Sequence, residues 1–288
     1  MINYRHAFHA GNFADVFKHT VLVGLIEALK VKPTAFCYVE THAGRGRYDL
    51  RGKEAARSPE YVDGVQRVLD AADAPGGALR QYADLVRSSN PERADGLVVY
   101  PGSPLLASRL MRERDRALLC ELQKAEADAL RTLFRGDPRI AVFQRDGYAA
   151  LGALLPPTPR RGLVLIDPPF EAQGDEFRTI ERALGIALDR WPTGVYAIWY
   201  PIKLRRAVTP FHRWLAGRNN VPDVLVAELL LHPENSPLRL NGAGMAIINP
   251  PWRFDRTLRE LLPVLLAVLS PARPARQRVR WLETRGRR

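Results

Sequence analysis

The sequence predicts an α/β fold in which a mostly parallel sheet of about seven strands carries helices on both faces and a small helical subdomain is inserted. Three observations predict it. From residue 117 onward, apolar strand-type runs alternate with segments of helical periodicity, as expected for parallel strands joined by crossover helices. A strand-type run at residues 35–39 leads into a loop of small residues, whereas residues 53–96 are helical with several Pro and Gly breakers. We therefore expect residues 1–52 and 97–288 to form the α/β domain and residues 53–96 the inserted subdomain.

The expected elements follow one another in the order that this fold requires. The first helix covers residues 12–30, with Asn12 as a typical N-cap and Pro33 shortly after its end. Later strands are expected at residues 97–100, 117–122, 140–144, 162–166, 194–199, 224–231 and 243–249, and later helices at residues 124–135, 147–155, 175–190 and 203–216. The Arg-rich end, residues 272–288, has two interpretations: a last strand at RVRWLE, or a flexible arm that binds phosphate.

Length and charge restrict the class of protein further. A chain of 288 residues is near the upper limit for one hydrophobic core, which favours one α/β domain with an insertion over two independent halves. Lys and Arg number 43 against 31 Asp and Glu, for a net charge of +12. That balance is typical of a protein that binds a nucleic-acid backbone, although a general use of Arg in place of Lys by a GC-rich genome would give the same excess.

Hydropathy and cysteine content predict the compartment. No run of about eighteen apolar residues, as a membrane span would need, is present, and the N-terminus lacks the apolar stretch of a signal peptide. The cysteines are Cys37 and Cys120, each within an apolar strand-type run. Two such cysteines suit a reducing compartment and exclude a Cys-rich zinc module. We therefore expect a cytoplasmic protein that does not enter a membrane.

A small-residue loop and two acidic residues follow successive strands. The loop is ETHAGRG, residues 40–46, and its Gly44 would let the backbone approach a ligand closely. It lacks the third glycine of the dinucleotide fingerprint, which lowers the odds of a nicotinamide or flavin enzyme. Glu121 could accept both hydroxyls of a ribose, and Asp146 could accept from an adenine amino group while Gly147 clears the ring. Each residue alone could be structural. Their order, a loop and then two acids at the tips of successive strands, matches the parts of an adenosyl ligand that lies across the edge of the sheet.

The most specific motif is LVLIDPPF, in which a buried strand ends in Asp167, two prolines and Phe170. An adenine amine is a poor nucleophile because its lone pair is delocalised into the ring. A catalyst must therefore hold both amine hydrogens, and Asp167 could take one and the carbonyl of Pro168 the other, since the prolines fix the backbone. Phe170 offers a face on which the base could stack. We expect these residues to be catalytic, with Asp167 also close to the ligand.

A second copy of this pattern occurs near the end of the chain. The sequence IINPPW, with Asn249 to Trp252 after its apolar run, also follows an expected strand. Only one copy can face the ligand. Asp167 lies one helix and one strand beyond Asp146, where the ligand-binding edge continues, whereas Asn249 belongs to the late strands near the far edge. We therefore assign residues 249–252 to structure.

The segment before the sheet, YRHAFHAGNFADVFKH, is rich in histidine, aromatic and small residues. Its histidines are His6, His9 and His19. Their spacing, with no neighbouring cysteine or carboxylate cluster, matches no zinc pattern, so we expect no metal. An arm that closes over ligand and base explains the composition better, with Tyr4 and Phe8 as stacking faces and with Lys18 and His19 near anionic or carboxylate groups. Core packing remains the alternative for about half of these side chains.

Taken together, YRHAFHAGNFADVFKH, THAGRGRY, YPGSP, DG, LIDPPF and GMAIINPPW resemble the RlmJ family of bacterial 23S ribosomal RNA adenine-N6 methyltransferases. The resemblance covers nearly the whole chain in order, including the helical insertion. It implies a Rossmann-like methyltransferase fold, S-adenosylmethionine as methyl donor, and an adenine of large-subunit ribosomal RNA as substrate. By position, it implies donor contacts from His19, His42, Ser103, Glu121, Asp146 and Gly147.

The resemblance also implies that Asp167 is catalytic and that Tyr4 meets the RNA, and we expect Lys18 to meet it too. Phe170 departs from the tyrosine usual in this motif, which preserves stacking but removes a hydroxyl. We expect the chain to act as a monomer. Two alternatives remain open: a DNA adenine-N6 methyltransferase, because the motif cannot read the sugar, and a nucleic-acid-binding protein that has kept the fold and lost the chemistry.

Overall fold

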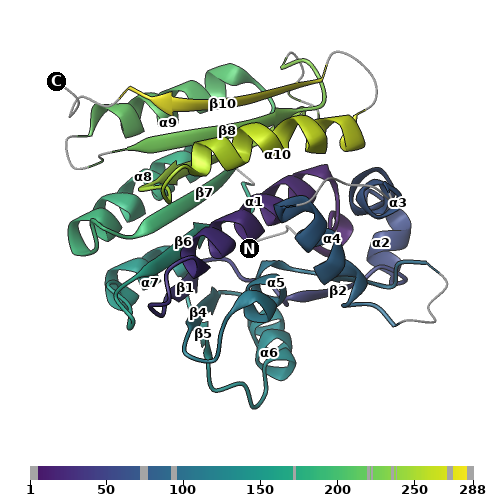
Figure 1. Ribbon diagram of the computed structural model, residues 1–288, viewed down its shortest axis with the longest axis horizontal. Helices are drawn as coiled ribbons and strands as arrows, with labels where there is room; N and C mark the ends of the chain where they lie inside the picture. Colours follow the sequence, from purple (N-terminus) through teal and green to yellow (C-terminus); the bar gives the residue numbers. More distant parts are fainter. Residues whose placement is uncertain are drawn as a thin grey trace.

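The computed structural model describes residues 6–71, 77–91, 96–170, 173–218, 221, 223–234, 237, 239–270 and 275–283. Within these residues an eight-stranded sheet has the order β10-β8-β9-β7-β6-β1-β4-β5, and Figure 1 shows it from β10 at the top to β5 at the bottom. Its strands are β1 (Cys37–Glu40), β4 (Arg116–Glu121), β5 (Ile140–Gln144), β6 (Gly162–Ile166), β7 (Val195–Ile202), β8 (Val224–Leu230), β9 (Gly242–Ile248) and β10 (Arg276–Leu282).

The sheet has a parallel half and an antiparallel half. Strands β5, β4, β1, β6 and β7 pair in parallel, whereas β9 is antiparallel to β7 and β8, and β10 is antiparallel to β8. The expected α/β fold with a mostly parallel sheet is confirmed. The basic end of the chain supplies the eighth strand, β10, so the strand interpretation is correct for residues 276–282.

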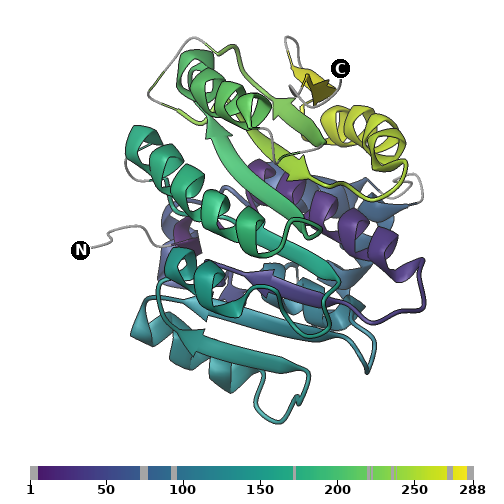
Figure 2. The same cartoon turned by 90° about the vertical axis from the view of Figure 1, so that its left-hand side faces the viewer.

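Helices cover both faces of the sheet, as Figure 2 shows with α1 and α8 on opposite sides. The face with the larger core carries α1 (Phe13–Lys30), α5 (Ser103–Leu110), α6 (Lys124–Leu133) and α10 (Phe254–Leu269). The other face carries α7 (Gly147–Leu154), α8 (Gln173–Arg190) and α9 (Arg205–Gly217). Among the described residues no helix is long and apolar enough to cross a membrane.

The segment between β2 (Arg47–Asp49) and β3 (Val99–Pro101) is helical, as expected. It contains α2 (Lys53–Arg57), the π-helical turn η2 (Val62–Gln66), α3 (Arg67–Asp70) and α4 (Ala78–Arg87). Of these elements, η2, α3 and α4 contact α1 or α10, and Val65, Leu79 and Tyr82 belong to the same apolar core as α1. The strand expected at residues 97–100 is β3, which pairs only with β2 in a separate two-stranded sheet.

Helix α1 is buried on nearly every side because it packs between the sheet and the helical insertion. Asn12 caps it as expected, since its side-chain oxygen accepts from the amides of Ala14 and Asp15, both at 3.0 Å. A helix in such a place should be apolar all round. Yet Asp15, Lys18, His19 and Thr20 are also buried, and buried polar side chains need partners. Thr20 donates to the carbonyl oxygen of Val16 in the same helix, whereas the partners of Asp15, Lys18 and His19 are described with the candidate site.

Candidate active site

Four strand tips carry acidic residues at one edge of the parallel half of the sheet. Glu40 ends β1 and Glu121 ends β4, while Asp167 directly follows β6 and Asp146 comes two residues after the end of β5. Because these strands are parallel neighbours, their carboxyl ends share an edge, which is where ligands bind in open α/β sheets. The structure thus brings together the acidic residues that the sequence predicted, and adds Glu40.

The loop between β1 and β2 fits against the tips of β4 and β5 through backbone contacts. Gly44 has a φ of +58°, a conformation that favours glycine, and its amide donates to Glu121 Oε2 at 2.9 Å. A Cβ at Gly147 would lie 1.9 Å from the carbonyl oxygen of Thr41. Close packing against this loop therefore requires glycine at position 147, whether or not that glycine also clears a ligand ring.

Glu121 and Asp146 are both engaged by backbone amides. Glu121 Oε1 accepts from the amide of Gln123 at 2.7 Å, and burial raises the pKa of the Glu121 carboxyl. Asp146 caps α7, because its Oδ1 accepts from the amides of Tyr148 and Ala149 at 2.8 and 3.3 Å. Each carboxylate has lone pairs beyond these bonds, so the predicted contacts to a ribose and to an amino group stay available.

The loop histidine is held as a neutral ring. His42 Nδ1 lies 2.8 Å from Thr41 Oγ1, and its ring meets that of Tyr148 edge-on at 4.9 Å. Burial lowers the pKa of His42 to about 4. An uncharged imidazole at this edge does not repel a cationic ligand, which suits the predicted contact with the donor.

Glu40 is fully buried and was missed as a separate site residue. Ser103 Oγ donates to its Oε1 at 2.5 Å and the Tyr38 hydroxyl donates to its Oε2 at 2.8 Å. Burial raises the pKa of Glu40 to about 8, although these two hydrogen bonds oppose the rise. Ser103, predicted to contact the donor, therefore also anchors the first strand tip.

His19 has one ring nitrogen satisfied and one not. Its Nδ1 lies 2.7 Å from the Tyr100 hydroxyl, which is 3.0 Å from the Tyr82 hydroxyl of the insertion. Its Nε2 is buried and has no hydrogen-bond partner among the described residues. Burial and then the charge of Lys18 lower the pKa of His19 well below its usual value. A buried neutral ring with an orphaned nitrogen is where a polar group of a ligand would be satisfied.

Lys18 joins Asp167 to the N-terminal segment. Its Nζ lies 2.5 Å from Asp167 Oδ2 and 2.9 Å from Asp15 Oδ1, and Asp15 Oδ2 is 2.9 Å from His6 Nε2. Burial alone would lower the pKa of Lys18, but the two carboxylates outweigh it and raise that pKa well above its usual value. Lys18 is 4% exposed, so in this structure it meets carboxylates inside the protein. An RNA contact by Lys18 remains a prediction.

The DPPF motif has an unusual backbone at its last residue. Phe170 has a φ of +50°, which costs free energy for a non-glycine residue and is found mostly at functional sites. Its ring is 8% exposed and meets Phe177 and Trp199 edge-on at 5.2 and 5.8 Å. In this conformation it therefore packs in the core, and base stacking by Phe170 stays a prediction. Tyr4 lies outside the described residues.

The second motif lies at the opposite edge of the sheet. Because β9 is antiparallel to β7, its last residue, Ile248, pairs with Tyr196 near the start of β7. Asn249 follows, and its side-chain amide donates to the carbonyl oxygens of Pro192 and Gly194 at 2.7 and 2.8 Å. The prediction that Asn249 is structural is confirmed, since it holds the turn that leads into β7.

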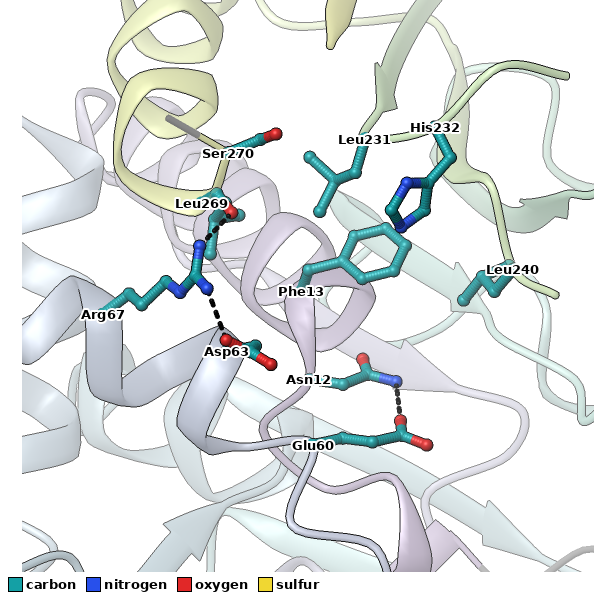
Figure 3. Close-up of a pocket in the computed structure, with 10 residues that line it drawn as sticks. All are labelled: Asn12, Phe13, Glu60, Asp63, Arg67, Leu231, His232, Leu240, Leu269 and Ser270. Atoms are coloured by element: carbon teal, nitrogen blue, oxygen red, sulfur yellow. Dashed lines mark hydrogen bonds and ion pairs between the residues drawn. The ribbon is translucent and has the colours of Figure 1, made fainter. Parts of the chain in front are cut away.

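A hollow of about 500 Å³ lies near the N-terminus of α1, and Figure 3 shows Phe13 facing His232 across it. Its polar side chains bond within the protein: Asn12 donates to Glu60, and Arg67 donates to the carbonyl oxygen of Leu269 at 3.0 Å. The hollow contains no residue predicted to be functional. Among the residues that the structure describes, no group of three or more His, Cys, Asp or Glu could hold a metal ion.

The sequence alone does not predict every residue of the site. It places Glu40 within the small-residue loop without indicating a separate role for this acid, and it indicates no contacts for Asp15 and His6. The available signal was a group of charged or polar residues, Asp15, Lys18, His19 and Thr20, in the first turns of a mostly apolar helix. Such a group in a buried helix indicates side chains that meet partners elsewhere in the chain.

Comparisons with known proteins agree with this geometry. The family model described as "RsmJ: Ribosomal RNA large subunit methyltransferase D, RlmJ" matches residues 33–283. Two curated relatives are each called "Ribosomal RNA large subunit methyltransferase J". The protein from Escherichia coli (strain K12) is 40% identical over 282 residues, 98% of this chain and 99% of the relative. The protein from Haemophilus influenzae is 39% identical with the same coverage.

A solved structure extends the likeness to three dimensions. The crystal structure of a protein from Legionella pneumophila, 33% identical in sequence, matches with a TM-score of 0.86 and covers 94% of this chain and 98% of its own. The match of the family model and the identity to the two curated relatives run over most of the chain. The chain therefore belongs to the RlmJ family of ribosomal RNA large subunit methyltransferases.

Proposed function

We propose that this protein transfers a methyl group from S-adenosylmethionine to the N6 amine of an adenine in 23S ribosomal RNA. It acts as a cytoplasmic monomer without a metal ion. Family membership supports the methyl transfer and the ribosomal RNA substrate. The observation that carries the choice of an amine is the Asp167 carboxylate at the tip of β6, held by Lys18 at 2.5 Å beside the other acidic strand tips.

The residues at the sheet edge fit the donor chemically. S-adenosylmethionine supplies an electrophilic methyl group on a cationic sulfonium, together with an ammonium group and a ribose. Acidic side chains at successive strand tips favour such positive charge, and the orphaned Nε2 of buried His19 offers a polar contact that the protein itself leaves unmade. We assign donor binding to His19, His42, Gly44, Ser103, Glu121, Asp146, Gly147 and Asp167.

The catalytic step rests on orientation of the amine. Lys18 occupies Asp167 Oδ2, which leaves Oδ1 to accept one hydrogen of the adenine amine. The carbonyl of Pro168 accepts the other, so that the nitrogen lone pair points toward the methyl group. This is catalysis by positioning and by preorganised hydrogen bonds rather than by a strong base. Tyr4 and Phe170 are assigned to the RNA base, and residues 53–96 to an inserted subdomain.

Replacing Asp167 with Ala tests the proposal. Lys18 keeps Asp15 as a counterion 2.9 Å away, so the variant should fold and bind the donor nearly as well as the native protein. We expect methyl transfer to fall by orders of magnitude, measured as incorporation of labelled methyl groups into 23S ribosomal RNA. Full activity of the variant would refute the role of Asp167.

The substrate is tested in parallel with the native protein. Labelled donor is incubated with naked ribosomal RNA, assembled large subunits and duplex DNA, and the modified nucleoside is identified by mass spectrometry. We expect N6-methyladenine in RNA only. Label in DNA alone would identify a DNA methyltransferase, and calorimetry that shows no donor binding would identify a nucleic-acid-binding protein without activity.

A further inference from the structure

A second hollow, of about 520 Å³, lies between α9 and β10 at the far edge of the sheet. We call it the α9–β10 hollow, and its charged lining consists of Arg205, Arg213 and Arg280 together with one acidic residue, Glu283. Its residues 280–283 belong to the Arg-rich end, for which the sequence left a phosphate-binding arm as one interpretation. None of its residues belongs to the site at the tips of β1, β4, β5 and β6. The electrostatic balance of these arginines shows what the hollow could bind.

Arg205 is compensated by carboxylates. Glu228, fully buried in β8, accepts from Arg205 at 2.6 and 2.9 Å, and Arg205 also pairs with Glu234 at 2.6 Å. Arg278 lies 3.5 Å from Glu228 as well. These contacts keep the pKa of Glu228 below its usual value despite burial. Arg205 therefore belongs to a closed network and cannot by itself attract an anion.

Arg280 differs because its contact is a neutral ring. Its NH2 group lies 2.9 Å from Nδ1 of His212, whose Nε2 lies 2.9 Å from the Tyr200 hydroxyl. Burial lowers the pKa of His212 to about 4, so the ring is uncharged at neutral pH. Arg280 can only donate, so Nδ1 must accept and the hydrogen must be on Nε2. Tyr200 then donates to Glu228 at 3.0 Å.

Arg280 is thus left with a charge and a donor that the protein does not satisfy. No carboxylate of the described residues forms an ion pair with it, and its Nε is buried without a hydrogen-bond partner in the same part of the chain. A buried unpaired donor costs about 1 to 3 kcal/mol. Arg213, exposed on α9 at the same hollow, adds a second positive charge without an ion pair among the described residues.

We propose that the α9–β10 hollow binds a phosphate of the RNA backbone, outside the nucleotide that is methylated. The planar guanidinium of Arg280 matches phosphate oxygens through paired donors, and Arg213 adds charge from the α9 side. Strands β6 and β10 are four inter-strand spacings apart, about 19 Å, so one RNA could reach both places. The inference rests on the proposed function, because it assumes an RNA substrate.

Two variants and a matched control test the hollow. Arg213→Glu reverses an exposed charge and should not disturb folding, whereas Arg280→Gln removes the partly buried guanidinium. Arg256→Glu on α10 makes the same charge change at an exposed arginine on the opposite face of the sheet. Binding of 23S ribosomal RNA fragments is measured by fluorescence anisotropy over a range of salt concentrations, and donor binding by calorimetry.

We expect Arg213→Glu and Arg280→Gln each to weaken RNA binding several-fold and to reduce the slope of log affinity against log salt by about 0.7 to 0.9, the value for one lost phosphate contact. Donor affinity and the rate at saturating RNA should not change, while KM for RNA rises. Arg256→Glu should leave the slope as in the native protein. An unchanged slope in both hollow variants, or an equal drop in the control, overturns the assignment.

Inorganic phosphate distinguishes a backbone site from a site for a free anion. Its binding is measured by calorimetry at constant ionic strength in the native protein and in Arg280→Gln. Binding lost in the variant while RNA affinity stays unchanged would identify a free-anion site and overturn the proposal. A native protein that methylates no RNA would instead refute the proposed function, so the two failures can be told apart.

Discussion

At the scale of single residues, the site depends on a lysine and a carboxylate that lie 149 positions apart in sequence. Lys18 is 4% exposed and has Asp15 on one side and Asp167 on the other. Removal of the shared cation leaves both carboxylates without it, which costs more than removal of one carboxylate, since Lys18 then keeps the other. Lys18 therefore fixes both the fold of the site and the direction of the Asp167 carboxylate.

Replacing Lys18 with Met should affect both properties. It leaves the buried Asp15 with His6 as its ion-pair partner and the partly buried Asp167 without its cation, so we expect a loss of about 3 to 5 kcal/mol in the free energy of unfolding. Activity should drop by about 100-fold or more because Asp167 is no longer held. Chemical denaturation and methyl incorporation well below the melting temperature measure the two effects.

Lys30→Met on the same helix is the control. Its partner is Glu27 at 2.6 Å, and both side chains are partly exposed. Pairs of that kind contribute up to about 1 kcal/mol, and Lys30 lies far from the strand tips. A Lys18→Met variant as active as Lys30→Met would show that Asp167 does not need its lysine.

Glu40 gives the site a pH dependence of known sign. Its pKa is raised to about 8 by burial from a usual 4.5, so the folded state holds a proton that the unfolded state loses. The contribution of Glu40 to stability is therefore complete at pH below 4.5 and is lost as pH rises toward 8. In Glu40→Gln this loss should vanish, and the free energy of unfolding should depend less on pH between 5 and 9.

Urea denaturation at several pH values measures this difference. The comparison with Glu121→Gln is informative, because the Glu121 pKa is also raised by burial but that carboxylate accepts two backbone amides. We expect Glu121→Gln to weaken the attachment of the β1–β2 loop and so to lower the free energy of unfolding at every pH. Parallel curves for native protein and Glu40→Gln would contradict the raised pKa.

At the scale of elements, the contact between the β1–β2 loop and the start of α7 can be tested with one methyl group. Gly147→Ala would place a Cβ 1.9 Å from the Thr41 carbonyl oxygen. A backbone carbonyl cannot move aside as the end of a flexible side chain can, so we expect the free energy of unfolding to fall by about 1 to 3 kcal/mol. We also expect weaker donor binding. Thermal unfolding and calorimetry with the donor are the measurements.

The same helix offers the matched control. At Gly152, also in α7, a Cβ would meet only Ile186 Cγ2 at 3.5 Å, which is ordinary contact. Gly152→Ala should be neutral or stabilise by up to about 1 kcal/mol through helix propensity. Equal changes in stability and donor binding for the two substitutions would show that packing of the β1–β2 loop does not require glycine at position 147.

The sequence was sufficient for those elements whose patterns are local. The strands β1, β4, β5, β6 and β7 and the helix α1 lie close to their predicted positions, because each has its own periodicity and stop signals. The short strands β2 and β3 pair with each other outside the main sheet, and three-residue strands have too few residues to show alternation. No local sequence pattern indicated the antiparallel pairing of β8, β9 and β10 either.

For the candidate site, the acids that follow strands could be found, but their partners could not. Asp167, Glu121 and Asp146 were predicted because strand tips meet at one edge of a parallel sheet. The ion pair of Asp167 with Lys18 joins segments far apart in sequence, and no local spacing pattern predicts such a contact. The left-handed backbone of Phe170 is likewise set by packing against Phe177 and Trp199.

At the scale of the whole molecule, the insertion and the sheet share one core. Val65, Leu79 and Tyr82 of the insertion belong to the same apolar cluster as α1 and α10, and the Tyr82 hydroxyl reaches Tyr100. Elements that share a core unfold together. We expect a single transition in calorimetry, with equal calorimetric and van't Hoff enthalpies. An earlier separate transition for residues 53–96 would show an independent subdomain.

The reversed direction of β9 has a consequence for how such a chain can change over time. Two tips of similar composition, DPPF and NPPW, are delivered to opposite ends of one sheet. Strand polarity thus decides which copy of the motif lies at the same end of the sheet as Glu40, Glu121 and Asp146. Mutations that make NPPW more similar to DPPF would place the motif at an end of the sheet where no substrate binds. The NPPW segment can therefore keep its role of holding a turn.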